Sequence, residues 1–241
     1  MTLRRSKPFH HRSMIKLNGG AWLKDVILGG QDGLVNVLGI VLGVAAATND
    51  SRIIIISGLA GTFAESISMA AVAYTSSKAA RDYYYSELER EKREMKHMPE
   101  AERREIRQIY RKKGFKGLLL ERVVKTITAS RKVWLQTMMV EELRMFPDDY
   151  EHPVQDAWVV GFSSFVGSLI PLASFFFLPV KPAVWASLLI AAVVLFFTGA
   201  AKARLTIGDW RRSGIELMLI GMLAALVGYG IGTLLGAMPA P

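Results

Sequence analysis

The chain has no cysteine and only four histidines among its 241 residues. The absence of cysteine excludes disulfides and thiolate-bound metals, and it leaves oxygen, imidazole and thioether groups as possible metal ligands. The sequence also lacks a glycine-rich phosphate loop, a nucleophile elbow and a recognisable catalytic triad. Each of these is typical of an ATP-driven pump or a hydrolase. We therefore expect a protein that is not an enzyme and that carries no prosthetic group.

Apolar and charged residues are separated into blocks along the chain. Hydrophobic residues make up 51% and charged residues 21%, with a mean hydropathy of +0.26. Five apolar runs stand out: Val26–Thr48, Ile53–Ser77, Ala157–Leu178, Ala183–Ala201 and Gly214–Leu235. Each is close to the ~20 residues that a helix needs to cross ~30 Å of hydrocarbon. We expect an all-α membrane protein with five transmembrane helices in a lipid bilayer.

The net charge of +9 is unevenly distributed along the chain. Basic residues gather in the N-terminus, in the 78–153 segment and in the loop after the fourth apolar run, whereas the opposite ends of the runs carry only Arg52 and Lys181. The positive-inside rule explains this pattern without nucleic acid, and it predicts that the N-terminus and the 78–153 insert are cytoplasmic. The first run is too long for a cleaved signal peptide. Since there is no long leader, we expect a prokaryotic cell membrane.

These patterns divide the chain into residues 1–77 with the first two spans, an insert at 78–153, and residues 154–241 with the last three spans. We expect the helix of span two to continue to Met98. Pro99 interrupts it and suits the first turn of a second helix, Glu100–Lys113. Gly114 and Gly117 mark a break before a third helix, Leu118–Phe146, which has an apolar face. The 78–153 segment is therefore predicted to be a three-helix cytoplasmic insert that binds metal.

Three residues within the first two spans are candidates for an ion path: Asp32, Glu65 and Met69. An ionisable residue inside a membrane costs several kcal/mol unless it faces protein or water. Asp32 and Met69 lie at similar depths, roughly 9 and 11 Å, and Glu65 is one helical turn from Met69 on the same face. A carboxylate beside a thioether favours a transition metal such as Fe²⁺ over Ca²⁺ or Mg²⁺, and such a carboxylate can also carry protons. The alternatives are buried, protonated structural acids and, for Met69 alone, core packing.

A second candidate cluster lies in the insert. Glu91 with Glu94, and Glu102 with Glu105, are each three residues apart, and the break at Pro99 can bring the two helix faces together. Met138 and Glu142 are placed to complete the cluster. Converging carboxylates repel each other unless a cation neutralises them. The alternative is a solvated surface of mixed charge, because lysines and arginines are interleaved with these glutamates.

Two further patterns leave alternatives open. Gly39 with Gly43, and Gly228 with Gly232 and Gly236, have the spacing that lets helices approach closely in lipid, either within one chain or between two copies. Glu94 and His97 form a single ExxH step, whereas helical di-iron proteins need two, so a ferroxidase is not supported. The other histidines are expected at solvent or interface positions. Pro171 is predicted to kink span three.

In its motifs the chain resembles the vacuolar iron transporter family from about residue 25 to the C-terminus. The similar stretches are DVILGGQDGLV, GLAGTFAESISMAAVAY, ELEREKREM, PEAERREI, WLQTMMVEEL and GSLIPL, in that order. The resemblance implies a homodimer with a cation path between the subunits and proton-coupled export of Fe²⁺ from the cytosol. It places the path residues at Asp32 and Met69, and the metal-binding residues of the insert at Glu91, Glu94, Glu102, Glu105, Met138 and Glu142.

The chain departs from the family's pattern at one position. The family commonly has a path glutamate after GLA, where this chain has Gly61, and a glutamate follows one turn later at Glu65. We expect Glu65 to substitute for it, displaced ~6 Å along the helix axis. The sequence thus predicts a homodimeric exporter of Fe²⁺ or Mn²⁺ in exchange for protons, with Zn²⁺ and Co²⁺ as further candidate ions. The alternative is a membrane-anchored metal buffer or sensor that binds metal without moving it.

Overall fold

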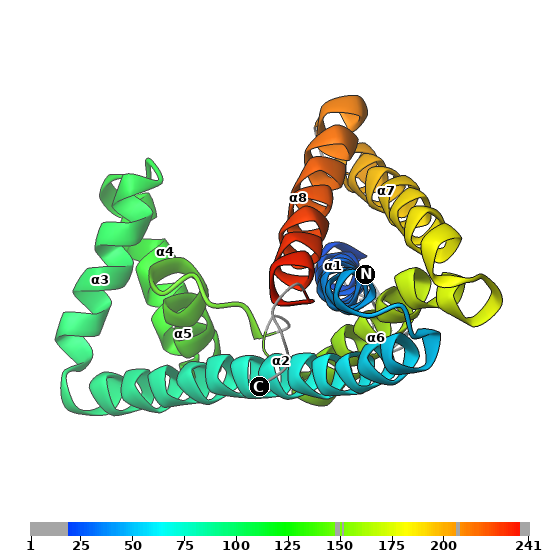
Figure 1. The fold of residues 1–241 in the computed structure, drawn as a ribbon. Coiled ribbons are helices and arrows are strands. Elements are labelled where there is room, and N and C mark those ends of the chain that lie inside the picture. The colour runs from blue at the N-terminus through cyan, green and yellow to red at the C-terminus, as the bar shows by residue number, and fades with distance from the viewer. Residues whose placement is uncertain (1–18, 148–149, 151, 206–207, 237–241) are drawn as a thin grey trace, which may run out of the picture. The chain divides into compact units, whose positions relative to one another are not determined.

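The computed structural model describes residues 19–147, 150, 152–205 and 208–236. The expectations for the basic N-terminus and for His10 and His11 fall outside these ranges. The described part is helical and contains no strand. Its elements are α1 (Gly19–Ala47), α2 (Ser51–His97), α3 (Pro99–Lys112), α4 (Gly117–Ala129), α5 (Arg131–Thr137), the π-helix η1 (Met138–Glu142), α6 (Pro153–Phe177), α7 (Val180–Leu205) and α8 (Trp210–Gly236) (Figure 1).

Five helices have the length and apolar composition needed to cross a membrane: α1, α2, α6, α7 and α8. They contain the five predicted runs except for Thr48 and Leu178, which confirms the prediction of an all-α protein with five helices long and apolar enough to span a membrane. Most of these helices extend beyond the predicted spans, because polar residues at their ends are helical too. The chain divides into two compact units, one made of residues 1–70 with 158–241 and the other of residues 71–157. Helix α2 contributes residues to both units.

In the first unit, α1 packs closely against α8 through the glycines that the sequence analysis singled out. A Cβ atom added to Gly228 would lie 2.5 Å from the carbonyl oxygen of Gly39, and one added to Gly43 would lie 3.0 Å from the carbonyl oxygen of Gly228. Gly232 lies against the backbone of Gly43 in the same way. Of the two alternatives for this glycine pattern, the structure shows packing within one chain.

Helix α6 packs on another side of α1. A Cβ atom on Gly29 would lie 2.5 Å from the hydroxyl oxygen of Ser163, so the two helices approach at small residues. Helix α6 continues through Pro171, whose carbonyl oxygen accepts a 2.8 Å hydrogen bond from the buried hydroxyl of Ser187. This bond ties α6 to α7, while the kink at Pro171 stays a prediction.

The second unit has its own apolar core, to which α2, α3, α4, α5 and η1 contribute. The buried members are Met95, Ile106, Leu120, Val124, Ile127, Trp134 and Met138. Pro99 lies in the first turn of α3, as predicted. Gly114 and Gly117 have φ values of +99° and +55°, a backbone conformation that favours glycine, and they form the predicted break between α3 and α4.

The prediction of one continuous third helix in the insert, Leu118–Phe146, is wrong, because the structure interrupts this helix and ends it earlier. Helix α4 stops at Ala129, and Ser130 has extended backbone angles of −113° and 118°. The Ser130 hydroxyl oxygen accepts a hydrogen bond from the amide of Val133 and caps α5. The chain then passes into η1 and leaves the helix after Glu142. The apolar spacing suggested one helix because α4 and α5 bury side chains in the same core.

Candidate functional site

Asp32 of α1 and Glu65 of α2 are joined in a small polar network between apolar helices. Glu65 lies close enough to Asp32 and Asn36 for their side chains to interact, and the Asn36 amide donates a 3.3 Å hydrogen bond to Asp32 Oδ2. Both acidic residues are half-buried. The two acidic side chains are therefore neighbours in the packed structure of the single chain.

Met69 lies one turn after Glu65 on α2 and is half-buried. The expectation that Asp32 and Met69 share one layer stays a prediction, since the structure pairs Asp32 with Glu65. The depth estimate counted residues from Val26, whereas α1 begins at Gly19, and such a count does not fix how far one helix is shifted along its neighbour. Only the packed structure shows how far α1 is shifted along α2.

Asn36 is a member of this network that the sequence analysis missed. It is a polar residue four positions after Asp32, and this spacing places it on the same helix face. An amide can donate to one carboxylate while it accepts from another group. A polar residue one turn from an acid within an apolar run is the signal that points to it.

In the second unit, Glu91 of α2 and Glu102 of α3 are buried, with 1% and 3% of their surface exposed. One oxygen of each carboxyl group, Oε2, is buried and has no hydrogen-bond partner among the residues that the structure describes. An unsatisfied buried acceptor costs about 1–3 kcal/mol, and more when it is charged. Each of these oxygens is able to accept a cation or a proton as its partner.

The remaining predicted glutamates of the insert interact with these two. Burial, together with the charges of Glu105, Glu91 and Glu94, raises the pKa of Glu102 to about 7. Burial also raises the pKa of Glu142 to about 7, together with the charges of Glu105 and Glu91 and a hydrogen bond with Glu105. Taken as a whole residue, Glu142 is exposed. The charges of the neighbouring acids therefore explain its raised pKa better than burial does. Burial and Glu94 likewise raise the pKa of Glu91.

The structure therefore brings the five predicted glutamates of the insert into one interacting group. Met138 lies four residues before Glu142 within η1, and its side chain is fully buried in the core. No group of three or more His, Asp or Glu residues in the described ranges is already arranged to hold a metal ion. Metal binding by this group requires the carboxylates to rotate toward a common centre.

Arg90 supplies the positive charge at this acidic group. Its Nη2 atom lies 2.8 Å from Glu87 Oε2 and 3.6 Å from Glu91 Oε1, and its Nε atom lies 3.8 Å from Glu94 Oε1. The neighbouring charge of Arg90 lowers the pKa of Glu91 and Glu102 and so opposes part of the rise. The sequence analysis treated the interleaved basic residues as signs of a solvated surface and missed this role.

A solvated surface of mixed charge is also present in the second unit. Exposed ion pairs join Lys92 to Glu89 at 2.6 Å and Arg103 to Glu100 at 2.7 Å. His97 of the single ExxH step and His152 are exposed. The surface alternative thus describes Glu89 and Glu100, whereas Glu91 and Glu102 are buried away from these pairs.

Known proteins resemble this chain over most of its length. The chain matches the VIT family over residues 23–233. It is 30% identical over 213 residues to "Vacuolar iron transporter 1" of Eucalyptus grandis, which covers 88% of this chain and 86% of that protein. It is 30% identical to "Vacuolar iron transporter 1" of Arabidopsis thaliana, over 91% of this chain and 88% of that protein. It is 31% identical to "Vacuolar iron transporter" of Toxoplasma gondii, over 89% and 74%. The sequence resemblance is thereby confirmed: this chain belongs to the VIT family.

Proposed function

We propose that this protein moves a divalent transition metal, Fe²⁺ or Mn²⁺, out of the cytoplasm and across the membrane in exchange for protons. The single observation that carries the proposal is the contact between Asp32 and Glu65 on two membrane-spanning helices of a VIT family chain. Relatives named vacuolar iron transporters support iron as the cargo. Family membership also supports a transporter over an enzyme.

The carboxyl pair gives a physical basis for exchange of metal and proton. When the two carboxyl groups share a proton, they have one negative charge between them, and a divalent cation that enters must compete with that proton. Loss of the proton gives the pair a charge of −2, which matches the charge of the metal. Proton release and metal entry are thereby coupled at the same two carboxyl groups. The amide of Asn36 holds these carboxyl groups in place.

Met69 supplies a ligand of a different kind one turn away. A thioether prefers softer transition metals, whereas Ca²⁺ and Mg²⁺ prefer shells made only of oxygen. We assign Met69 to selection against these abundant hard cations. In the second unit, the glutamates of the insert collect metal, and Met138 serves as their thioether partner.

A homodimer with the path between its subunits is part of the proposal. On α1, Leu28, Asp32, Asn36 and Ile40 follow each other every four residues and form one stripe. In the single chain, Leu28 is 51% and Ile40 is 40% exposed. A second copy would cover this stripe and would place two Asp32 residues along one passage.

The orientation and the compartment are proposals as well. The excess of basic residues at one end of the spans supports a cytoplasmic N-terminus and a cytoplasmic insert. The relatives compared are named vacuolar transporters of eukaryotes, so placement in a prokaryotic cell membrane rests on the sequence alone. The multi-pass membrane character itself follows from the five apolar helices.

Metal flux into proteoliposomes tests the proposal. We expect Asp32→Ala to abolish Fe²⁺ flux, because it removes one of the two path carboxylates, while the purified protein keeps the elution volume of the wild type. The matched control is Asp82→Ala, which removes an exposed carboxylate of α2 outside the spans and should leave flux unchanged. Wild-type flux in Asp32→Ala would refute the assigned path. Metal binding without flux in the wild-type protein would favour the buffer or sensor.

A further inference from the structure

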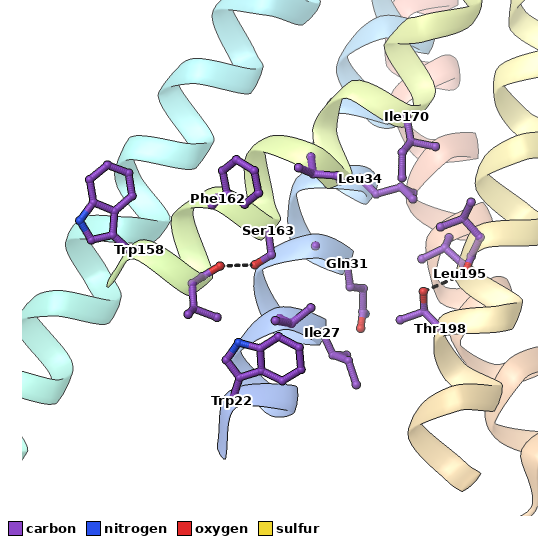
Figure 2. A pocket seen from close by; sticks show the side chains of 16 residues that line it. Trp22, Ile27, Gln31, Leu34, Trp158, Phe162, Ser163, Ile170, Leu195 and Thr198 are labelled. Carbon is purple, nitrogen blue, oxygen red and sulfur yellow. Dashed lines mark hydrogen bonds between the residues drawn. The ribbon is translucent and has the colours of Figure 1, made fainter. Parts of the chain in front are cut away.

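The groove between α1, α6 and α7 in the first unit offers no charged side chain that acts on a metal ion (Figure 2). Its lining consists of apolar residues and a few uncharged polar ones, such as Gln31 and Ser163. The second unit differs, because a basic side chain, that of Arg90, touches two glutamates of the predicted metal site. This contact bears on how tightly that site holds a metal ion.

Arg90 lies among three glutamates of α2 that share one helix face. Glu87, Glu91 and Glu94 are separated by four and three residues, so their side chains follow each other along this face. Like charges at such spacings repel each other and destabilise a helix. The guanidinium of Arg90 contacts all three carboxylates. One fixed positive charge therefore offsets part of the repulsion among three negative charges.

The three contacts of Arg90 differ in strength. Its Nη2 atom lies 2.8 Å from Glu87 Oε2, which is a hydrogen-bond distance. The contacts with Glu91 and Glu94, at 3.6 and 3.8 Å, are too long for direct hydrogen bonds. The side chain of Glu87 is also less exposed than that of Glu94, at 12% against 34%. Glu87, which is not a predicted metal ligand, thus anchors the guanidinium, and the predicted ligands are held more loosely.

Arg90 does not satisfy the acidic group completely. Oε1 of Glu91 faces the guanidinium, whereas Oε2 is buried and has no hydrogen-bond partner among the described residues. Glu102 of α3 has a second such oxygen. Because Glu91 and Glu102 are only 1% and 3% exposed, bulk water does not reach them freely. The group therefore keeps acceptor oxygens for a cation smaller than a guanidinium.

We propose that Arg90 is a tethered counter-ion of the empty site, which competes with the metal for Glu91 and Glu94 and lowers the affinity of the insert for divalent ions. The inference rests on the proposed role of the insert in collecting metal. A metal ion bound to these two carboxylates lies close to the guanidinium, so the two cations repel each other. Metal binding therefore weakens the two long contacts of Arg90, while Glu87 retains the guanidinium.

A counter-ion of this kind suits a site that has to release its metal again. It lowers the affinity of the site without removing a ligand, and it stabilises the acidic group while no metal is bound. Arginine fits this role, because its guanidinium stays charged at all physiological pH values and its planar fork reaches several carboxylates at once. Arg90 thus sets the affinity of the metal site without being a ligand.

Titration of the detergent-solubilised full chain with Mn²⁺ tests this proposal, with free Mn²⁺ measured by its electron paramagnetic resonance signal. Every protein also carries Asp32→Ala, so that the proposed membrane path does not contribute to binding. We expect Arg90→Gln to bind Mn²⁺ roughly tenfold more tightly than its parent. Arg90→Lys, which keeps the charge but not the planar fork, should lie between the two. The matched control is Arg93→Gln, which removes an exposed charge from the same turn of α2 and should change the affinity by about twofold at most.

Thermal unfolding of the same proteins separates competition from a purely structural role. Without metal, we expect Arg90→Gln to lower the unfolding midpoint by roughly 2–4 °C, because the glutamates lose their counter-ion. Saturating Mn²⁺ should remove most of this difference, since the variant binds the ion more tightly. A side chain that only supported the structure would lower both the midpoint and the affinity when it is replaced.

Unchanged or weaker Mn²⁺ binding by Arg90→Gln would overturn the proposal, as would the absence of Mn²⁺ binding in every variant. If Arg90→Gln does not fold, the outcome is decided by Arg90→Lys, whose affinity must exceed that of the parent. These measurements need no transport. A wild type that shows no metal flux, together with the expected affinities in these variants, would refute the proposed transport and leave the role of Arg90 intact.

Discussion

At the scale of single residues, the acidic groups of the second unit hold protons more strongly than ordinary glutamates do. Glu91 and Glu102 each keep one oxygen buried and unsatisfied among the described residues, and the pKa of Glu102 and that of Glu142 are raised to about 7. Near neutral pH this group therefore holds protons that ordinary glutamates would have lost. A metal ion that binds there has to replace them.

This predicts a metal affinity that depends on pH. The pKa of Glu102 and that of Glu142 lie near 7 in the folded chain, against 4.5 as the ordinary value. The folded state then binds more protons than the unfolded state between pH 4.5 and 7, so the stability of the metal-free unit falls as pH rises through this window. Metal affinity should rise over the same window, because the competing protons leave.

Calorimetry in buffers of different ionisation enthalpy measures the protons released. We expect close to two more protons to be released per metal at pH 6 by the wild type than by the variant Glu102→Gln with Glu142→Gln. Equal proton release from the two proteins would show that these glutamates do not titrate with metal binding.

A second prediction at this scale concerns Met138. Met138→Leu keeps the side-chain volume, so the free energy of unfolding should change by less than about 1.5 kcal/mol. Loss of the thioether should reduce the affinity of the insert for Fe²⁺ relative to Mn²⁺, since the softer ion gains more from sulfur. The matched control is Met139→Leu, which replaces an equally buried methionine. If both variants keep the wild-type ratio of Fe²⁺ to Mn²⁺ affinity, Met138 is only a core residue.

At the scale of elements, the packing of α1 on α8 depends on close backbone contact. A Cβ atom on Gly232 would overlap the backbone of Gly43, whereas a Cβ atom on Gly230 would meet nothing within 4 Å. We expect Gly232→Ala to destabilise the protein by about 1–3 kcal/mol through overpacking, and Gly230→Ala to be neutral or slightly stabilising in this helix. Thermal unfolding in detergent measures both changes. Equal unfolding midpoints for the two variants would mean that α1 and α8 move apart at Gly232 with little loss of stability.

The sequence predicted the long elements better than the short ones. The five spans follow from their apolar length, and the break between α3 and α4 follows from Gly114 and Gly117. The division of the third insert helix at Ser130 did not follow, because apolar spacing continues through it and only the serine cap marks the change. The pairing of Asp32 with Glu65 was likewise not predicted, since sequence gives the face of a helix but not its shift along a neighbour.

At the scale of the whole molecule, the chain combines two units of different chemistry. The first is apolar and places an acidic pair on membrane-spanning helices, and the second groups five glutamates around its own core. Neither unit alone distinguishes a transporter from a binding protein. In the proposed mechanism, binding by the second unit raises the supply of metal, and the proton held by Asp32 and Glu65 couples metal entry to proton movement.

The most direct test of this account measures metal and proton flux together. Proteoliposomes carry an Fe²⁺-sensitive dye and a pH-sensitive dye in the lumen, and the external metal is added with and without an acidic lumen. We predict that an acidic lumen accelerates Fe²⁺ uptake and that the lumen becomes less acidic as the metal enters, with both signals lost in Asp32→Ala. Fe²⁺ uptake that is unaffected by the pH gradient and leaves the lumenal pH unchanged would contradict the proposed exchange.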